Sequence, residues 1–179
     1  MKRISVILAL LVFIQISSSV QAKNPVCKDN NAPVESRIKD LVSKMSLDEK
    51  ILQLNQYTAG MNTNANNIGE QTKSIPAGIG SLIYFSIGPE LRNAIQKKAM
   101  EESRFGIPIL FGYDVIHGFS TIYPISLAQA CFWNPALVTE AAAVAGKEAN
   151  LAGLDLTFSP LIDVAHNGRW GRAAEGYGE

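Results

Sequence analysis

The sequence has few of the residues that build metal centres or disulfide scaffolds, with two cysteines and two histidines among its 179 residues. No cluster of Cys, His and Glu is present to complete a ligand set, so we expect no metal site and no cofactor. Two cysteines are too few for a fold held by several disulfides. We expect Cys27 and Cys131 to be free thiols, with Cys131 buried in an apolar stretch as a small hydrophobic side chain.

An excess of charge of one sign is also missing. The 16 basic residues balance the 16 acidic ones, so the formal net charge is +0 at pH 7. A chain without a basic excess has no electrostatic attraction for nucleic acid or for an anionic lipid surface. The composition therefore favours an uncharged small molecule as the partner, and it leaves the oligomeric state open.

The chain has no apolar run of about 20 residues, the length that spans a bilayer. Its longest apolar segment covers residues 4–16, follows two basic residues and leads to small residues that end at Ala22. This order is typical of a secretory signal peptide. We expect residues 1–22 to be removed on export to the periplasm or the medium, which leaves 23–179 as one domain without a membrane anchor.

Beyond the signal, the pattern alternates between helical and strand-like segments. Helices are predicted over residues 33–45, 46–54, 89–105 and 135–152, after an irregular polar tail at 23–32 and around a loop at 58–74. Continuous apolar strands are predicted over residues 80–85, 107–112 and 154–162.

Strands that alternate with helices indicate parallel βαβ units, and continuously apolar strands indicate a sheet that is covered on both faces. Two architectures fit this pattern, a doubly wound open sheet and a (β/α)8 barrel. Gly78 and Gly80 precede the first predicted strand, whereas a dinucleotide-binding turn follows it and carries a third glycine. We therefore favour the barrel, of which this α/β chain would supply about three βα units.

Asp114 lies just beyond the second predicted strand, and His117 follows three residues later. In a barrel, a carboxylate in this position points into the mouth, where it can accept hydrogen bonds from two sugar hydroxyls. Alternatively, Asp114 ends the strand as a turn cap. Because no further ligands accompany the pair, we expect His117 to be structural and hydrogen-bonded below the pocket.

The third predicted strand runs into a segment, residues 163–179, that is rich in Arg and Gly. Arg169 and Arg172 offer planar forks of donors for vicinal hydroxyls or a carboxylate, and Trp170 offers a flat apolar face for a pyranose. Alternatively, the segment is a surface loop with Arg–Glu pairs. Glu175 lies three positions after Arg172, so we expect the two to pair, with Glu175 orienting the arginine rather than acting as an acid.

Four segments in this order resemble the family 3 glycoside hydrolases, the β-glucosidase and β-xylosidase group. RIKDLVSKMSLDEKILQLNQ is similar to the opening helix of the family, and AGIGSLIYF is similar to its first strand. The second and third strands with their loops resemble ESRFGIPILFGYDVIHGFSTIYPISLAQA and LTFSPLIDVAHNGRWGRAAEGYGE. The resemblance covers nearly all of the chain after the signal.

The resemblance implies retaining hydrolysis of terminal β-glycosidic bonds. It assigns the Asp of the D-V-I-H-G segment, Asp114, and the second Arg of R-W-G-R, Arg172, to hydroxyls of the sugar at the scissile bond. The GYDVIHG segment resembles the glucosidase and xylosidase side of the family rather than its N-acetylglucosaminidase branch.

The resemblance also implies that the residues of the chemical step lie outside this chain. The family takes its Asp nucleophile from a late barrel strand, a Lys-His pair from an intermediate strand, and its general acid from a second domain. A barrel of this kind needs about 250 residues. We therefore assign no catalytic residue and expect an N-terminal fragment of the enzyme. The alternative is a truncated, non-catalytic protein that binds sugar weakly at most.

Overall fold

The computed structural model describes residues 25–59, 68–85, 88–164 and 166–177. The predicted signal peptide, residues 1–22, lies outside the described residues. The chain divides into two compact units, Met1–Ser46 and Leu47–Glu179, and each is described by itself. No helix in the described ranges is long and apolar enough to cross a membrane.

The first unit contains a short 3-10 turn, η1 (Val26–Lys28), and helix α2 (Val34–Lys44). The predicted helix is confirmed, and the polar segment before it is irregular except for this 3-10 turn, which the sequence did not predict. The amide of Cys27 donates to a carboxylate oxygen of Asp40 at 2.9 Å, and Arg37 Nε donates to the Cys27 carbonyl at 3.3 Å. Polar side chains of α2 stabilise the turn, so no apolar pattern in the sequence predicts it.

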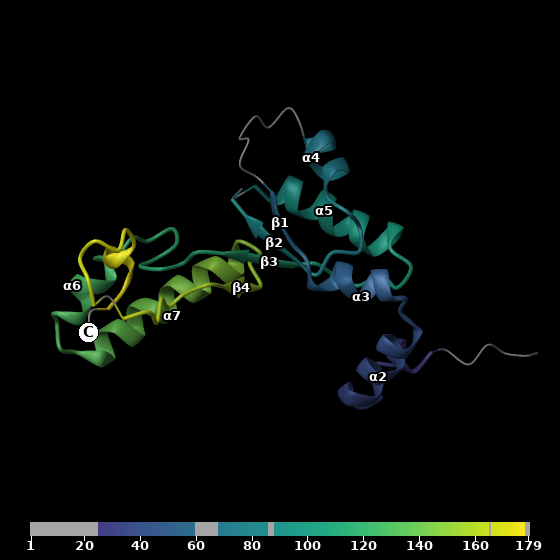
Figure 1. Cartoon of the computed structure of the whole chain (residues 1–179), viewed down its shortest axis with the longest axis horizontal. Helices are drawn as coiled ribbons and strands as arrows, with labels where there is room; N and C mark the ends of the chain where they lie inside the picture. Colours follow the sequence, from purple (N-terminus) through teal and green to yellow (C-terminus); the bar gives the residue numbers. More distant parts are fainter. Residues whose placement is uncertain (1–24, 60–67, 86–87, 165, 178–179) are drawn as a thin grey trace, which may run out of the picture. The chain divides into compact units, whose positions relative to one another are not determined.

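The second unit contains a four-stranded parallel sheet, with strands β1 (Gln56–Ala59), β2 (Ser81–Tyr84), β3 (Leu110–Tyr113) and β4 (Leu156–Thr157). Each strand lies beside the next one along the chain (Figure 1). In a doubly wound sheet the order reverses at a switch point, whereas a barrel keeps the order of the chain. The sheet therefore has the order of a barrel segment, as predicted.

The described part of the sheet has four strands rather than the three that the sequence predicts. Strand β1 and helix α4 (Ile68–Ser74) fall at the two ends of the segment predicted as a loop. The residues of β1 face solvent except Ala59, and the sequence of the strand is not apolar. The search for apolar runs therefore did not find it. It forms because it pairs with β2, from Gln56 opposite Ser81 to Ala59 opposite Tyr84.

The predicted third strand was too long. Its ladder with β3 covers only Leu156 and Thr157 and ends with one further bond, from the Phe158 amide to the Tyr113 carbonyl at 3.3 Å. The second predicted strand is displaced, because pairing begins at Leu110 instead of residue 107 and extends to Tyr113. An apolar run marks burial, but a ladder also requires a neighbouring strand in register.

The main helices form where the pattern predicts them. They are α3 (Leu47–Leu54), α5 (Pro89–Glu102) and α7 (Pro135–Leu151), while the short α6 (Ser126–Ala130) was not predicted. Proline starts both α5 and α7, a position where its missing N–H costs no helical hydrogen bond.

The core of the second unit lies between the sheet and helix α5. The inward face of α5 is the predicted one, formed by Leu91, Ile95 and Ala99. The largest fully buried side chains packed with them are Leu82, Phe111, Ile79 and Ile109.

Arg92 ties α5 to the segment that enters β4. Its guanidinium lies 4.7 Å from the centre of the Phe111 ring, and its Nε donates to the Gly153 carbonyl at 2.5 Å. Gly153 has a φ of +88°, and a Cβ there would lie 2.6 Å from Arg92 Nε. Only glycine fits this turn, because any other side chain would meet both the strained backbone and the arginine.

Both cysteines are free, as predicted. Cys131 is exposed, however, and the expectation that it would be buried was wrong. It stands at the C-terminal cap of α6, where its amide donates back to Leu127 and Gln129. The apolar neighbours of Cys131 in the sequence are themselves exposed, with Trp133 at 93%.

Candidate functional site

The polar residues singled out in the sequence gather at the carboxyl edge of the sheet. Strand β3 ends at Tyr113, so Asp114 is the first residue beyond it and is exposed. Strand β4 ends at Thr157, and the chain then runs through Asp163 to Arg172. Because parallel strands end at the same edge, both loops start from one side of the sheet.

Three aromatic rings contact one another in sequence, and the middle ring belongs to Tyr113, which directly precedes Asp114. Phe85 follows β2 and meets the ring of Tyr113 edge-on at 5.8 Å between centroids, and Tyr113 meets Phe119 edge-on at 6.0 Å. Edge-to-face contacts of this kind add stability beyond the apolar area that they bury. The rings therefore connect the end of β2, the end of β3 and the loop that follows Asp114.

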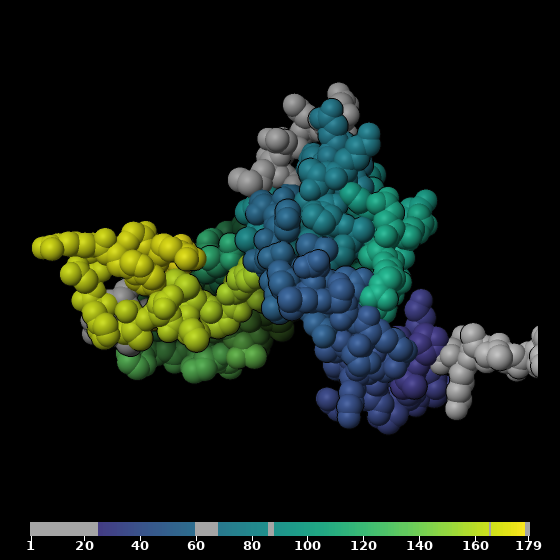
Figure 2. Space-filling view, turned by 45° about the vertical axis from the view of Figure 1, so that its right-hand side comes forward, coloured from purple at the N-terminus to yellow at the C-terminus, as the bar shows by residue number. Residues whose placement is uncertain are grey.

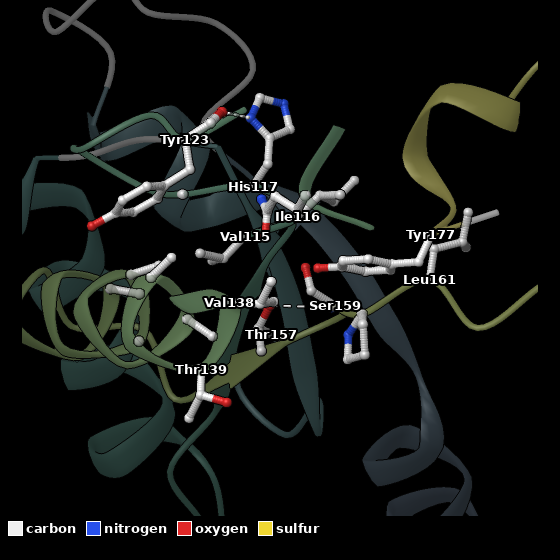
Figure 3. Close-up of a pocket in the computed structure, with 18 of the residues that line it drawn as sticks. Val115, Ile116, His117, Tyr123, Val138, Thr139, Thr157, Ser159, Leu161 and Tyr177 are labelled. Carbon is white, nitrogen blue, oxygen red and sulfur yellow. Dashed lines mark hydrogen bonds between the residues drawn. The ribbon is translucent and has the colours of Figure 1, made fainter. Parts of the chain in front are cut away.

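The loop after Asp114 is closed by hydrogen bonds between its two ends. His117 Nδ1 lies 3.0 Å from the Tyr123 carbonyl oxygen, and the Tyr123 amide donates to the His117 carbonyl at 2.8 Å (Figure 3). Gly118, with a φ of +122°, makes the turn that this closure needs. The expected hydrogen bonding of His117 is therefore present, while its part in any sugar site stays a prediction.

Arg172 and Glu175 form the predicted pair. Arg172 Nε donates to Glu175 Oε1 at 2.8 Å, and Nη2 donates to Oε2 at 2.6 Å. The 3-10 turn η3 (Ala173–Glu175) brings the two side chains together. The bidentate bond lowers the pKa of Glu175 and raises the pKa of Arg172, so both groups stay charged.

Asp114 and Asp163 also act on Arg172. After the Glu175 hydrogen bond and charge, the charges of Asp114 and Asp163 raise the pKa of the guanidinium further. Charges from two loops therefore act on one arginine, and we call Asp114, Asp163, Arg172 and Glu175 the charged cluster. Asp163 was not among the predicted site residues, and its position directly after an apolar strand is the one signal in the sequence that could have assigned it to this cluster.

A hollow of about 760 Å³ lies between α7 and the two loops. Its polar lining includes His117, Ser159, Asp163 and Tyr177, but Asp114 and Arg172 are not among its lining residues. Figure 2 shows the C-terminal segment, in yellow, lying along α7, in green. The hollow therefore shares Asp163 with the charged cluster, while Asp114, Arg172 and Glu175 lie outside its lining.

Within the hollow, one hydroxyl has no partner in the described structure. Ser159 Oγ is buried and makes no hydrogen bond, although the Ser159 amide donates to Thr157 Oγ1 at 3.2 Å. The hydroxyl ends of Ser159 and Tyr177 point toward the same space in Figure 3. The described residues hold no group of three or more His, Cys, Asp or Glu side chains placed to bind a metal ion.

The parallel strands lie in chain order, helices connect them, and acids and an arginine follow their carboxyl ends. These features define a segment of a βα-barrel domain, a class that carries enzyme sites in the loops at this edge. The comparisons with known proteins name the family. The sequence signature described as "Glycosyl hydrolase family 3 N terminal domain" matches residues 46–179, and the chain belongs to this family.

Relatives of known name agree with this assignment. The chain is 38% identical over 142 residues to a periplasmic β-glucosidase of Salmonella typhimurium, and the match covers 79% of this chain and 18% of the relative. It is 32% identical over 168 residues to a putative β-xylosidase of Formosa agariphila, with 85% and 22% covered. The chain thus spans about a fifth of the length of these relatives.

Solved structures agree as well. A mutant β-glucosidase from Listeria innocua, determined in complex with laminaribiose, superposes with a TM-score of 0.70 at 35% identity. The superposition covers 83% of this chain and 22% of that protein. The same Listeria enzyme in complex with glucose gives a TM-score of 0.69 at 34% identity. The barrel-segment fold predicted from the sequence is therefore confirmed.

Proposed function

We propose that this chain is the N-terminal part of an exported, retaining β-glycosidase that removes terminal β-linked glucose or xylose from short oligosaccharides. The chain belongs to glycosyl hydrolase family 3, and the relatives that it resembles are named β-glucosidases and β-xylosidases. The observation that carries the proposal is the cluster in which the charge of Asp114 reaches Arg172 while Glu175 holds that arginine from its own loop.

In this proposal, Asp114 and Arg172 bind the hydroxyls of the terminal sugar. The Asp114 carboxylate accepts hydrogen bonds from two hydroxyls, and the guanidinium of Arg172 donates to a third from the opposite loop. Glu175 takes two of the five donors of Arg172, which leaves the others for the sugar. Hydrogen bonds that strengthen as the ring flattens toward the transition state lower the barrier rather than only tightening binding.

The chemical step in this proposal uses groups from the rest of the polypeptide. A retaining glycosidase needs a carboxylate nucleophile and a general acid about 5 Å apart on either side of the scissile bond. The chain itself supplies the hydrogen bonds to the sugar from Asp114 and Arg172. His117 supports this binding indirectly, by closing the loop that leaves the sheet at Asp114.

Export is part of the same proposal. A basic start, an apolar run at 4–16 and small residues up to Ala22 have the order of a signal peptide, and one relative is named a periplasmic enzyme. Expression with a C-terminal tag, followed by fractionation and N-terminal sequencing, tests it. Mature protein that begins at Lys23 outside the cytoplasm supports export, whereas uncut protein in the cytoplasm contradicts it.

The activity is tested on the full-length polypeptide that carries this chain. Purified protein is assayed with aryl β-glucoside and aryl β-xyloside, and the configuration of the first sugar released is followed by proton NMR. Release of the β-anomer supports a retaining mechanism, and release of the α-anomer contradicts it. No hydrolysis above a buffer blank, together with weak binding of glucose, would instead support a non-catalytic sugar-binding protein.

A further inference from the structure

Helix α7 carries an acid that reaches across to the loop after β3. Glu148 Oε2 accepts hydrogen bonds from the amides of Ser120 at 3.0 Å and Thr121 at 2.8 Å. Its other oxygen, Oε1, accepts from Thr121 Oγ1 at 2.6 Å. One carboxylate therefore holds three donors at the tip of a loop whose neck is closed by His117 and Tyr123.

The position of Glu148 on its helix is unfavourable by local rules. It lies in the last turn of α7, and its carbonyl accepts the amide of Ala152 beyond the helix end. The carbonyls at a helix C-terminus repel a negative charge. The described structure shows no ion pair to Glu148 that would offset this repulsion. The three hydrogen bonds from the loop therefore stabilise the negative charge of Glu148. They also lower its pKa, Thr121 most of all, and keep the carboxylate charged.

The loop tip is in turn packed against the residue that precedes Asp114. Phe119 is the neighbour of Ser120 in the chain, and its ring meets the ring of Tyr113 edge-on at 6.0 Å and 86°. Tyr113 ends β3 and is bonded to Asp114. A continuous set of contacts therefore runs from Glu148 through the loop tip to the backbone that presents Asp114.

We propose that Glu148 is a positioning residue for the sugar site, which fixes the tip of loop 117–123 so that Phe119 and Tyr113 hold Asp114 in place. The inference rests on the proposed function, because only the proposed function makes Asp114 a sugar-binding residue. Glu148 itself touches no substrate. Its removal leaves the Asp114 carboxylate in the chain but free to move away from the position that the hydroxyls require.

The test compares kcat/KM for an aryl β-glucoside in variants of the full-length enzyme. Glu148→Ala removes all three hydrogen bonds, and we expect kcat/KM to fall about 10- to 100-fold, as displacement of a binding group by roughly 1 Å does. Glu148→Gln keeps one acceptor oxygen for the two amides and should recover part of this loss. Glu140→Ala, which removes an exposed acid from the same helix, is the matched control and should leave kcat/KM unchanged.

A double variant separates positioning from general stability. If Glu148 acts through Asp114, then Glu148→Ala added to Asp114→Ala should lower kcat/KM by less than about twofold further, because the group that it positions is already gone. A loss as large in the Asp114→Ala background as in the wild type would overturn the inference. If Glu148→Ala does not fold, Glu148→Gln is used in the same comparison.

The outcomes distinguish this inference from the proposed function. A wild-type enzyme that does not hydrolyse either glycoside contradicts the proposed function, and the positioning role falls with it. An active wild type with an equally active Glu148→Ala variant contradicts the positioning role alone. The positioning role is supported if Glu148→Ala lowers kcat/KM in the wild type, if Glu148→Gln recovers part of that loss, and if Glu148→Ala causes no comparable loss in the Asp114→Ala background.

Discussion

Arg172 is the residue on which the two loops of the candidate site converge. It is bound at two nitrogens by Glu175, and the charges of Asp114 and Asp163 act on it from further away. Its side chain nevertheless remains 58% exposed, so part of the guanidinium is open to a ligand. An arginine that is oriented on one side and open on the other is suited to binding hydroxyls in a fixed geometry.

At the residue scale, the first prediction concerns Asp114. Replacing Asp114 by Ala in the full-length enzyme removes an acceptor of hydroxyl hydrogen bonds and should lower kcat/KM about 100-fold, the effect of losing one oriented hydrogen-bonding group in other enzymes. Because Asp114 is exposed, the midpoint of thermal unfolding should change little.

The control for Asp114 is Asp48→Ala, which removes an exposed acid at the start of α3. Steady-state kinetics and thermal unfolding are measured on both variants and on the wild type. Equal kcat/KM in Asp114→Ala and Asp48→Ala would show that Asp114 does not bind the substrate.

The second prediction concerns Glu175. Glu175→Gln removes the charge that orients Arg172, so kcat/KM should fall several-fold near neutral pH while the fold remains. Arg172 lowers the pKa of Glu175 below its ordinary value of 4.5. The pair is therefore present above that value and is lost as the pH falls through the lowered pKa.

The pH dependence gives the Glu175 prediction its sharpest test. The ratio of kcat/KM between the wild type and Glu175→Gln should shrink only as the pH falls through the lowered pKa of Glu175, which lies below 4.5, because the wild-type carboxylate becomes neutral there as well. Glu90→Gln, at an exposed position near the start of α5, is the control and should match the wild type at every pH. A ratio that stays constant from neutral pH downward would contradict the orienting role.

At the scale of elements, α4 shows how a short helix is stabilised from outside itself. The Nζ of Lys98, on α5, donates to the carbonyls of Thr72 at 3.0 Å, Lys73 at 3.2 Å and Ile75 at 2.7 Å. These carbonyls lie at or just beyond the C-terminal end of α4, where no amide of the helix can reach them. A cation is favoured at this end of a helix by the macrodipole as well.

The third prediction follows from this cap. Lys98→Met keeps most of the aliphatic stem but loses three hydrogen bonds from a charged donor, and should lower the free energy of unfolding by about 1–2 kcal/mol. Lys97→Met, on the exposed side of the same helix, should change it little. Both are measured on the full-length protein by denaturant unfolding, with hydrogen exchange of α4 amides as a local readout. Equal stability and equal exchange in the two variants would contradict the cap.

At the scale of the whole chain, both units leave apolar side chains exposed. In the first unit, the apolar face of α2 is uncovered, with Val34 at 63% and Ile38 at 49%. In the second unit, Leu151 is 78% exposed and Ile162 is 86% exposed. Large exposed apolar faces are uncommon in a soluble monomer and mark surfaces that pack against other structure.

The fourth prediction is that the isolated chain 23–179 is neither stably folded nor active. Within the described residues, β1 and β4 each have one unpaired edge, and open edges with apolar residues favour association with other chains. The net stability of a whole domain is only about 5–15 kcal/mol. The free energy that the exposed apolar faces would gain by packing is therefore large relative to the stability of the chain.

Two measurements on the purified chain check this prediction. Thermal unfolding should show a broad transition or aggregation, and an aryl β-glucoside should not be hydrolysed above a buffer blank. A sharp cooperative transition of a monomer would contradict the first expectation. Turnover in protein free of host glycosidases would contradict the second.

Several features were determined by the sequence alone. The spacing of apolar side chains is enough to place α2 and α5, and Asn134-Pro135 with the alanine-rich segment after it is enough to place α7, because a helix closes its hydrogen bonds locally. The spacing of three residues was likewise enough to predict the bond between Arg172 and Glu175. Asp114 and His117 could be chosen because they follow an apolar strand.

Tertiary structure alone decided the rest. Strand β1 has no apolar run and exists because β2 supplies its hydrogen bonds, while β4 is short because its ladder with β3 ends at Thr157. The order of the strands and the grip of Glu148 on residues 120–121 join segments more than 20 positions apart along the chain. No local pattern encodes such contacts, because their energy is gained only when two distant segments have already been brought together by the core.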